Sequence, residues 1–125
     1  MSVRSYRDLE VWRQSMDLAE AVWRLSARFP ADQRFGMTSQ VRRAATSVPA
    51  NIAEGAQRNG TGEFLQFLGI ASGSLAETET FLLLAERLGL LPHEQTKVAL
   101  EQADNVGRML SGLKRSLQTR RGARG

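Results

Sequence analysis

Apolar side chains recur along four stretches of this sequence with the three- and four-residue spacing of amphipathic helices. In the first stretch two such seams run side by side, one starting at Leu9 and the other at Val11. Together they cover roughly 180° of the helix surface, whereas a helix at the rim of a bundle needs a stripe only somewhat over ~100° wide. The extra width predicts a second contact, within the fold or with another chain. We place this helix at residues 8–28, with Asp8 as its N-cap and Pro30 as its stop.

A second helix is expected at residues 39–58, after a loop at 29–37 and with Thr38 as its cap. Its apolar positions follow the same helical spacing. Pro49 lies inside this stretch. A proline has no amide donor and its ring clashes with the carbonyl four residues earlier, so we expect a kink here, with a full break as the alternative.

The third helix is the longest, at residues 62–88, with Thr61 as its cap and Gly89 as its stop. Its apolar stripe predicts a core face. A second stripe consists of small residues, which let another helix approach closely: Gly69, Gly73, Ala76 and Thr80. Because each glycine costs up to ~1 kcal/mol of helix stability, close packing is the expected compensation. This helix is therefore expected at the centre of the fold, buried on at least two sides.

A fourth helix is expected at residues 92–117, with Pro92 at its first position. Short connections between consecutive helices make antiparallel neighbours. The sequence therefore predicts an all-α, up-down-up-down four-helix bundle over residues 1–117. The last eight residues, 118–125, have no apolar side chain beyond one alanine and are predicted to form a disordered basic tail.

Composition excludes several kinds of chemistry. The chain of 125 residues has no cysteine and a single histidine, so disulfides, thiol nucleophiles and zinc ribbons are excluded. That histidine, His93, has no partner for a two-histidine metal motif, and Glu77 and Glu79 point in different directions on a helix. We expect no metal, no cofactor and no enzymatic activity. No signal peptide or membrane span is predicted, which favours the cytoplasm.

The net charge of +4 is concentrated at one end of the chain. Five basic and no acidic side chains lie in residues 114–125, which leaves 12 basic and 13 acidic side chains before them. The five are Lys114, Arg115, Arg120, Arg121 and Arg124. A basic, flexible tail binds phosphate backbones without sequence preference, or simply solubilises a frayed end.

A polar stripe runs along the second helix, opposite its apolar positions: Arg43, Ser47, Asn51, Glu54 and Arg58. Three interpretations stay open. The stripe is a solvated face, a hydrogen-bonded subunit interface, or a nucleic-acid surface on which Arg42, Arg43 and Arg58 meet phosphates.

Several motifs together resemble one family. Its most specific run is Arg42-Arg-Ala followed by Ser47-Val-Pro-Ala-Asn-Ile-Ala-Glu-Gly, and the likeness spans about residues 5–117. The chain resembles the small bacterial four-helix-bundle proteins encoded in intervening sequences of 23S ribosomal RNA genes. It is also similar to the accessory protein of diversity-generating retroelements, which works with a reverse transcriptase and nucleic acid. The resemblance implies a ring-like homopentamer without enzymatic activity.

The leading hypothesis is a non-enzymatic homo-oligomeric scaffold that binds RNA, DNA or a nucleic-acid enzyme. Its candidate subunit-interface residues are Ser47, Asn51, Glu54, Gly69 and Gly73. The alternative is a protein–protein adaptor or regulatory partner with no nucleic-acid contact.

Overall fold

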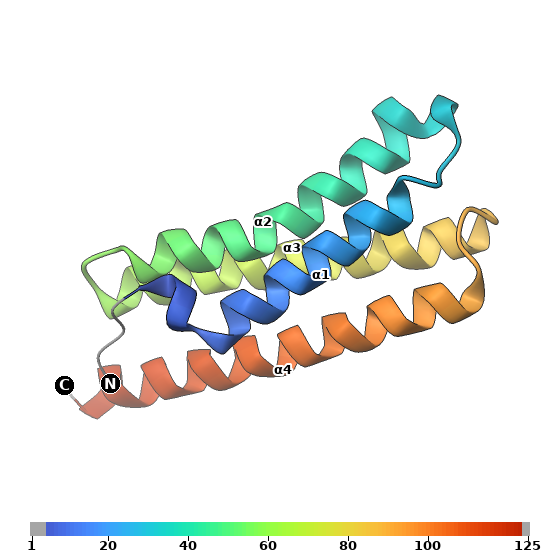
Figure 1. Ribbon diagram of the computed structural model, residues 1–125. Coiled ribbons are helices and arrows are strands. Elements are labelled where there is room, and N and C mark those ends of the chain that lie inside the picture. Colours follow the sequence, from blue (N-terminus) through green and yellow to red (C-terminus); the bar gives the residue numbers. More distant parts are fainter. Residues whose placement is uncertain (1–4, 124–125) are drawn as a thin grey trace.

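A computed structural model describes residues 5–123, and within them the chain is entirely helical apart from short connections (Figure 1). The prediction of an all-α fold is confirmed. The α-helices are α1 (Glu10–Ser26), α2 (Ser39–Ala56), α3 (Thr61–Arg87) and α4 (His93–Ala123). A short 3-10 helix, η1 (Tyr6–Asp8), precedes α1. The α1–α2 connection holds a second 3-10 helix, η2 (Ala31–Gln33), and a π-helical turn, η3 (Arg34–Thr38).

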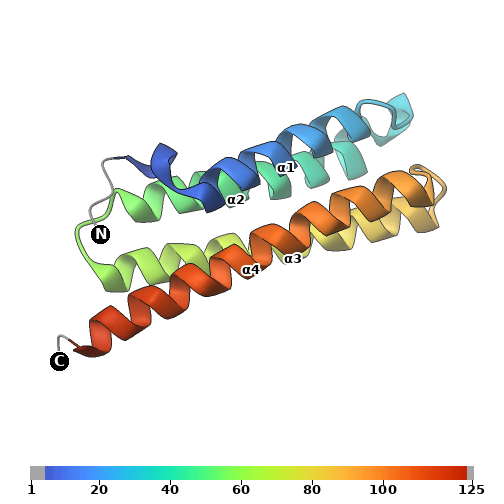
Figure 2. The same cartoon turned by 60° about the horizontal axis from the view of Figure 1, so that its bottom comes forward.

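Consecutive helices run antiparallel and pack side by side, and α1 also packs against α4, which closes the bundle. Figure 2 shows α1 and α2 as one layer above α3 and α4. Each helix turns its apolar stripe inward, as the spacing predicts. The largest fully buried apolar side chains come from all four helices: Leu18, Val22, Val41, Val48, Ile52, Leu68, Leu82, Val106 and Leu110.

The first helix begins later than predicted, and Asp8 is not its N-cap. Asp8 ends η1, whose own cap is Ser5, where the hydroxyl accepts the amide of Arg7 at 3.1 Å. Leu9 follows in an extended conformation and α1 starts after it. Leu9 is only 8% exposed, so burying this leucine in the core takes precedence over capping the helix with the aspartate.

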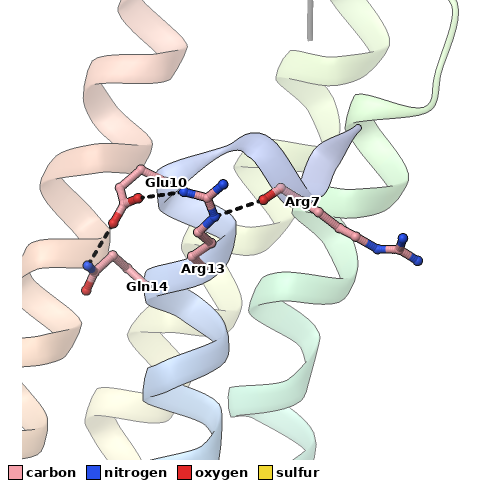
Figure 3. Close-up of polar contacts among 4 residues, drawn as sticks. All are labelled: Arg7, Glu10, Arg13 and Gln14. Atoms are coloured by element: carbon pink, nitrogen blue, oxygen red, sulfur yellow. Dashed lines mark hydrogen bonds and ion pairs between the residues drawn. The ribbon is translucent and has the colours of Figure 1, made fainter. Parts of the chain in front are cut away.

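Side chains of the first turn of α1 tie it to η1 (Figure 3). The Nε of Arg13 donates to the backbone carbonyl of Arg7 at 3.0 Å, and its guanidinium lies 3.4 Å from the carboxylate of Glu10. Gln14 donates to the same carboxylate at 3.1 Å. Arg13 therefore pairs with Glu10, three positions before it, and not with Asp17, four positions after it. These exposed contacts fix how η1 leads into α1, and each contributes a few tenths of a kcal/mol, at most about 1.

The second helix differs from expectation at its start. Residues predicted as loop form η2 and η3, and η3 runs directly into α2, so Thr38 has helical backbone angles and caps nothing. Met37, 8% exposed, anchors this segment to the core. Pro49 lies inside an unbroken α2, so the alternative of a full break is wrong.

The two ends of α3 differ in how closely they follow the prediction. Gly60, not Thr61, is the N-cap of α3. At the other end Gly89 has a φ of +77°, which favours glycine, and the amide of Leu90 donates to the carbonyl of Ala85 at 2.8 Å. The predicted stop is therefore confirmed. Pro92 lies just before the first residue of α4 and accepts the amides of the first turn.

Residues 118–123 continue α4, where the sequence pattern predicts a disordered tail. Leu117, 4% exposed, is the last buried side chain among residues 93–122 of this helix. Once the packed part of α4 has formed, each further helical residue adds one backbone hydrogen bond. Cations are also favourable at a helix C-terminus. Residues 124 and 125, including Arg124, lie outside the part of the chain that the structure describes.

Candidate functional site

The outward side of α3 is apolar and exposed over almost its whole length. We call this surface the outer face of α3. It presents Ile70, Leu83, Leu84 and Leu88, which are 41–57% exposed, between the small residues Gly69, Gly73, Ala76 and Thr80. Between residues 65 and 88 this face carries only two charged side chains, Glu77 and Arg87. Contiguous exposed apolar surface of this kind marks an interaction site.

The two glycines on this face are not needed by packing inside the chain. A Cβ added at Gly69 or Gly73 would meet no atom within 4 Å. Gly55 is the opposite case, because a Cβ there would lie 2.7 Å from the Cβ of Phe67. The small residue that lets α2 approach α3 is therefore Gly55, and the expectation that α3 is buried around its small-residue stripe is wrong within one chain.

Low charge also makes α3 the one helix among residues 5–123 that is long and apolar enough to span a membrane by length and composition. A core helix of a soluble protein meets the same criterion. Only 28% of that apolar window is buried here, so packing within this chain does not account for its composition. Part of the remainder, such as Phe64, Leu65 and Phe81, is partly buried against the core, and the exposed part is the outer face of α3.

Two members of the polar stripe on α2 bond inside the chain. The amide of Asn51 donates to the hydroxyl of Ser47 at 2.9 Å and to its carbonyl at 2.8 Å. The hydroxyl of Ser74 on α3 donates to the Ser47 hydroxyl at 2.8 Å. These groups join α2 to α3 of the same chain. Sequence reasoning missed Ser74, whose spacing places it on the buried side of α3.

Glu54 and Arg58 form an ion pair, with 2.8 Å between the guanidinium and the carboxylate. Arg58 also lies 3.9 Å from Glu63 and 4.9 Å above the ring of Phe67. Two nearby carboxylates neutralise much of its field, so Arg58 is a weaker phosphate ligand than its charge alone indicates.

Arg42 points toward α1 and holds its C-terminal turn. Its Nε donates to the hydroxyl of Ser26 at 2.8 Å, and its Nη2 donates to the carbonyl of Trp23 at 3.1 Å. The guanidinium also lies 4.3 Å above the Trp23 ring, and the indole donates to Thr46 at 3.3 Å. A cation placed on helix C-terminal carbonyls stabilises that helix, so Arg42 serves the α1–α2 contact.

Arg43, the next residue, is exposed and lines an open groove of about 610 Å³. The groove is built from the last turn of α1, η3 and the first half of α2. Its lining contains three arginines and four hydroxyl side chains and no carboxylate: Trp23, Arg34, Thr38, Ser39, Arg42, Arg43, Thr46, Ser47 and Ala50.

The predicted phosphate-binding arginines do not form one cluster. Arg43 and Arg58 are separated by about 22 Å along α2, at 1.5 Å per residue. The α2–α3 turn, which contains Arg58, lies at the same end of the bundle as the C-terminal part of α4 (Figure 1). In that part of α4 Lys114 is half-buried and Arg115, Arg120 and Arg121 are exposed. A Cβ at Gly62 would lie 3.4 Å from the Arg121 guanidinium. The fold therefore separates the basic residues into two groups.

A further group of titratable side chains lies on α3 and α4. A groove of about 740 Å³ between these helices holds Glu79, Asp104, Arg108 and Arg115. Burial, with the nearby Asp104 carboxylate, raises the pKa of Glu79. His93 lies 3.4 Å from Glu86 at the exposed α3–α4 turn. Among residues 5–123 there is no group of three side chains able to hold a metal ion.

Comparisons with known proteins give one family. The 23S rRNA-intervening sequence protein model matches residues 7–112. A similar solved structure is that of a protein of unknown function from the S23 ribosomal protein family of Bacteroides thetaiotaomicron. It has a TM-score of 0.78 and 28% sequence identity, and the match covers 83% of this chain and 97% of that one. A comparison with curated proteins finds no match. Because the family model spans most of the bundle, the chain belongs to the 23S rRNA-intervening sequence protein family.

Proposed function

We propose that this protein is a homo-oligomeric scaffold, without enzymatic activity, that binds nucleic acid or a nucleic-acid enzyme. The observation that carries the proposal is the outer face of α3. It exposes Ile70, Leu83, Leu84 and Leu88 in one chain and contains almost no charge. An exposed surface of this composition is stabilised when a second chain removes it from water.

A second copy of this chain is the occupant that we propose for this face. The glycines at 69 and 73 have open space beside them, which admits a helix backbone from another subunit. Each glycine costs up to ~1 kcal/mol of helix stability, and contact with another subunit offsets that cost. The homopentamer implied by the family resemblance is the assembly that we expect.

The nucleic-acid part of the proposal is supported by charge. After Asp104 the chain contains no further acidic residue, while α4 carries several exposed basic side chains in its last turns. Cations held on a rigid helix release counterions when they meet a phosphate backbone. The resemblance to the retroelement accessory protein, which works with a reverse transcriptase and nucleic acid, also supports this part of the proposal.

Enzymatic activity is left out of the proposal on grounds of sequence. The chain has no cysteine and one histidine, and that histidine sits in an exposed turn beside Glu86. The sequence contains no two-histidine metal motif and no recognised nucleophile–base motif, which supports a function without catalysis.

Light scattering of the purified protein tests the assembly. At micromolar concentration the unmodified chain is expected to have a mass several times that of one chain. Leu84→Glu and Gly73→Glu place a charge in the proposed interface and are expected to reduce the mass toward that of a monomer. The matched control is Asn105→Glu on the exposed side of α4, which is expected to leave the mass unchanged.

Circular dichroism keeps the test decisive, because a variant that loses helicity has unfolded rather than dissociated. A monomeric unmodified chain at these concentrations would contradict the proposal. The protein–protein adaptor would then be the better account, with the outer face of α3 contacting a different protein.

A further inference from the structure

We propose that the groove between the end of α1 and the start of α2 is a binding site for single-stranded nucleic acid. In this site Arg34 and Arg43 neutralise phosphates, groove hydroxyls donate to phosphate oxygens, and Phe35 stacks on a base. The inference deepens the nucleic-acid part of the proposed function and rests on it. It adds a contact at this groove, at the other end of the bundle from the basic last turns of α4.

The charge in the groove is not neutralised inside the chain. Arg13, Arg24 and Arg58 each pair with a carboxylate of a neighbouring turn. Within residues 5–123 neither Arg34 nor Arg43 forms an ion pair, and no carboxylate lines the groove. Along α2 the first acidic residue is Glu54, beyond the groove. These two cations are therefore available to an external anion.

Arg42 and the hydroxyls give the groove a fixed wall. Arg42 is held against α1 by Ser26 and the Trp23 carbonyl, so its charge stays in place in the wall of the groove. The Ser47 hydroxyl accepts hydrogen bonds from Asn51 and Ser74, and its own proton is donated to no atom of the described chain. Thr38 and Ser39 add two further hydroxyls along the same wall. Neutral donors beside cations are the usual partners of phosphate oxygens.

An exposed aromatic ring lies next to this basic wall. Phe35 is 89% exposed, the most exposed large apolar side chain among residues 5–123. The guanidinium of Arg34 lies 5.5 Å from the centre of its ring. Burial in the core does not account for this phenylalanine, whereas stacking on an unpaired base would cover it. Basic grooves with adjacent aromatic rings bind single strands with little sequence preference.

Fluorescence anisotropy with a labelled oligothymidylate strand, measured across a salt series, tests the site. Arg34→Gln with Arg43→Gln is expected to reduce the slope of log affinity against log salt by about 1.4, from about 0.7 per phosphate contact on a single strand. Arg24→Gln with Arg108→Gln removes the same net charge elsewhere and is expected to leave the slope within about half of one contact. Arg34→Lys with Arg43→Lys is expected to restore the slope.

Stacking is tested separately from charge. Phe35→Ala is expected to weaken binding about 5- to 100-fold while leaving the salt slope unchanged. Val98→Ala truncates another exposed apolar side chain, 59% exposed on α4, and is expected to leave affinity unchanged. A smaller affinity for duplex DNA of the same length would support the base contact.

The outcomes separate this inference from the proposed function. If the unmodified chain binds with a steep slope and the Arg34 and Arg43 variant keeps it, the groove assignment is overturned while nucleic-acid binding stands. If the unmodified chain does not bind even at low salt, both are overturned. Thermal melting of each variant identifies any loss of fold.

Discussion

At the scale of single residues, neighbours in sequence have different roles that spacing alone does not separate. Arg42 and Arg43 were both predicted to contact phosphate. The first stabilises the C-terminal turn of α1, and only the second is exposed in the groove. The difference depends on where α1 ends and how α2 is rotated against it. A helical wheel of α2 shows neither the end of α1 nor the rotation of α2 against it. This part of the site therefore could not be predicted from sequence.

Gly55 gives a prediction at the same scale. A Cβ there would lie 2.7 Å from the Cβ of Phe67 and 3.3 Å from the carbonyl of Phe64, and a backbone atom cannot move aside as a flexible side chain can. Gly55→Ala is therefore expected to lower the free energy of unfolding by about 1–3 kcal/mol. Urea denaturation of the variant and of the unmodified chain measures this difference in the free energy of unfolding.

Gly112→Ala is the matched control for that experiment. A Cβ at this helical position would meet no atom within 4 Å, so alanine is expected to raise stability by up to ~1 kcal/mol. Equal stability changes in the two variants would show that the α2–α3 approach does not depend on the glycine.

At the scale of elements, the sequence predicts helices better than it predicts their ends. The apolar spacing identifies all four helices, because burial of one stripe is the dominant stabilising term for each. Helix starts depend on which neighbouring side chain is buried, as Leu9 shows beside Asp8. The outer face of α3 was visible in the sequence as a stripe of small residues. That it is exposed in one chain became clear only when all four helices were placed.

The contact between α3 and α4 predicts a pH dependence. Burial, with the Asp104 carboxylate, raises the pKa of Glu79 above its ordinary value of 4.5, although Arg108 and Arg115 line the same groove. A raised pKa in the folded state means that folding favours the protonated form. The stability contributed by this group is therefore complete below the pKa of the unfolded chain and is lost as pH rises through the folded pKa.

Glu79→Gln imitates the protonated side chain. We expect this variant to melt at a higher temperature than the unmodified chain at pH 7, and the two melting temperatures to converge below about pH 4. Glu101→Gln, exposed on the outside of α4, is the matched control and is expected to show no such convergence. A variant that melts lower than the unmodified chain at pH 7 would contradict this assignment.

At the scale of the whole molecule, the bundle topology follows from helix order and short connections, and both are readable from sequence. The distribution of charge in space is not. Basic residues that the sequence groups by type lie in the groove near η3 and at the opposite end, around Arg58 and the last turns of α4. The length of α2 keeps its two ends apart, while antiparallel packing brings the α2–α3 turn beside the end of α4.

The continuation of α4 beyond Leu117 gives the last prediction. Residues 118–123 contribute no buried side chain among those described, but they hold Arg120 and Arg121 on a helix instead of a flexible tail. A chain ending at Leu117 is expected to keep its melting temperature within a few degrees and to form an assembly with the same number of subunits. This truncation removes Arg120, Arg121 and Arg124, so its salt slope on a single strand is expected to fall by about 0.7 for each that meets a phosphate, about 2.1 at most. An unchanged slope would mean that this segment is a solubilising end, and that the groove arginines account for the binding.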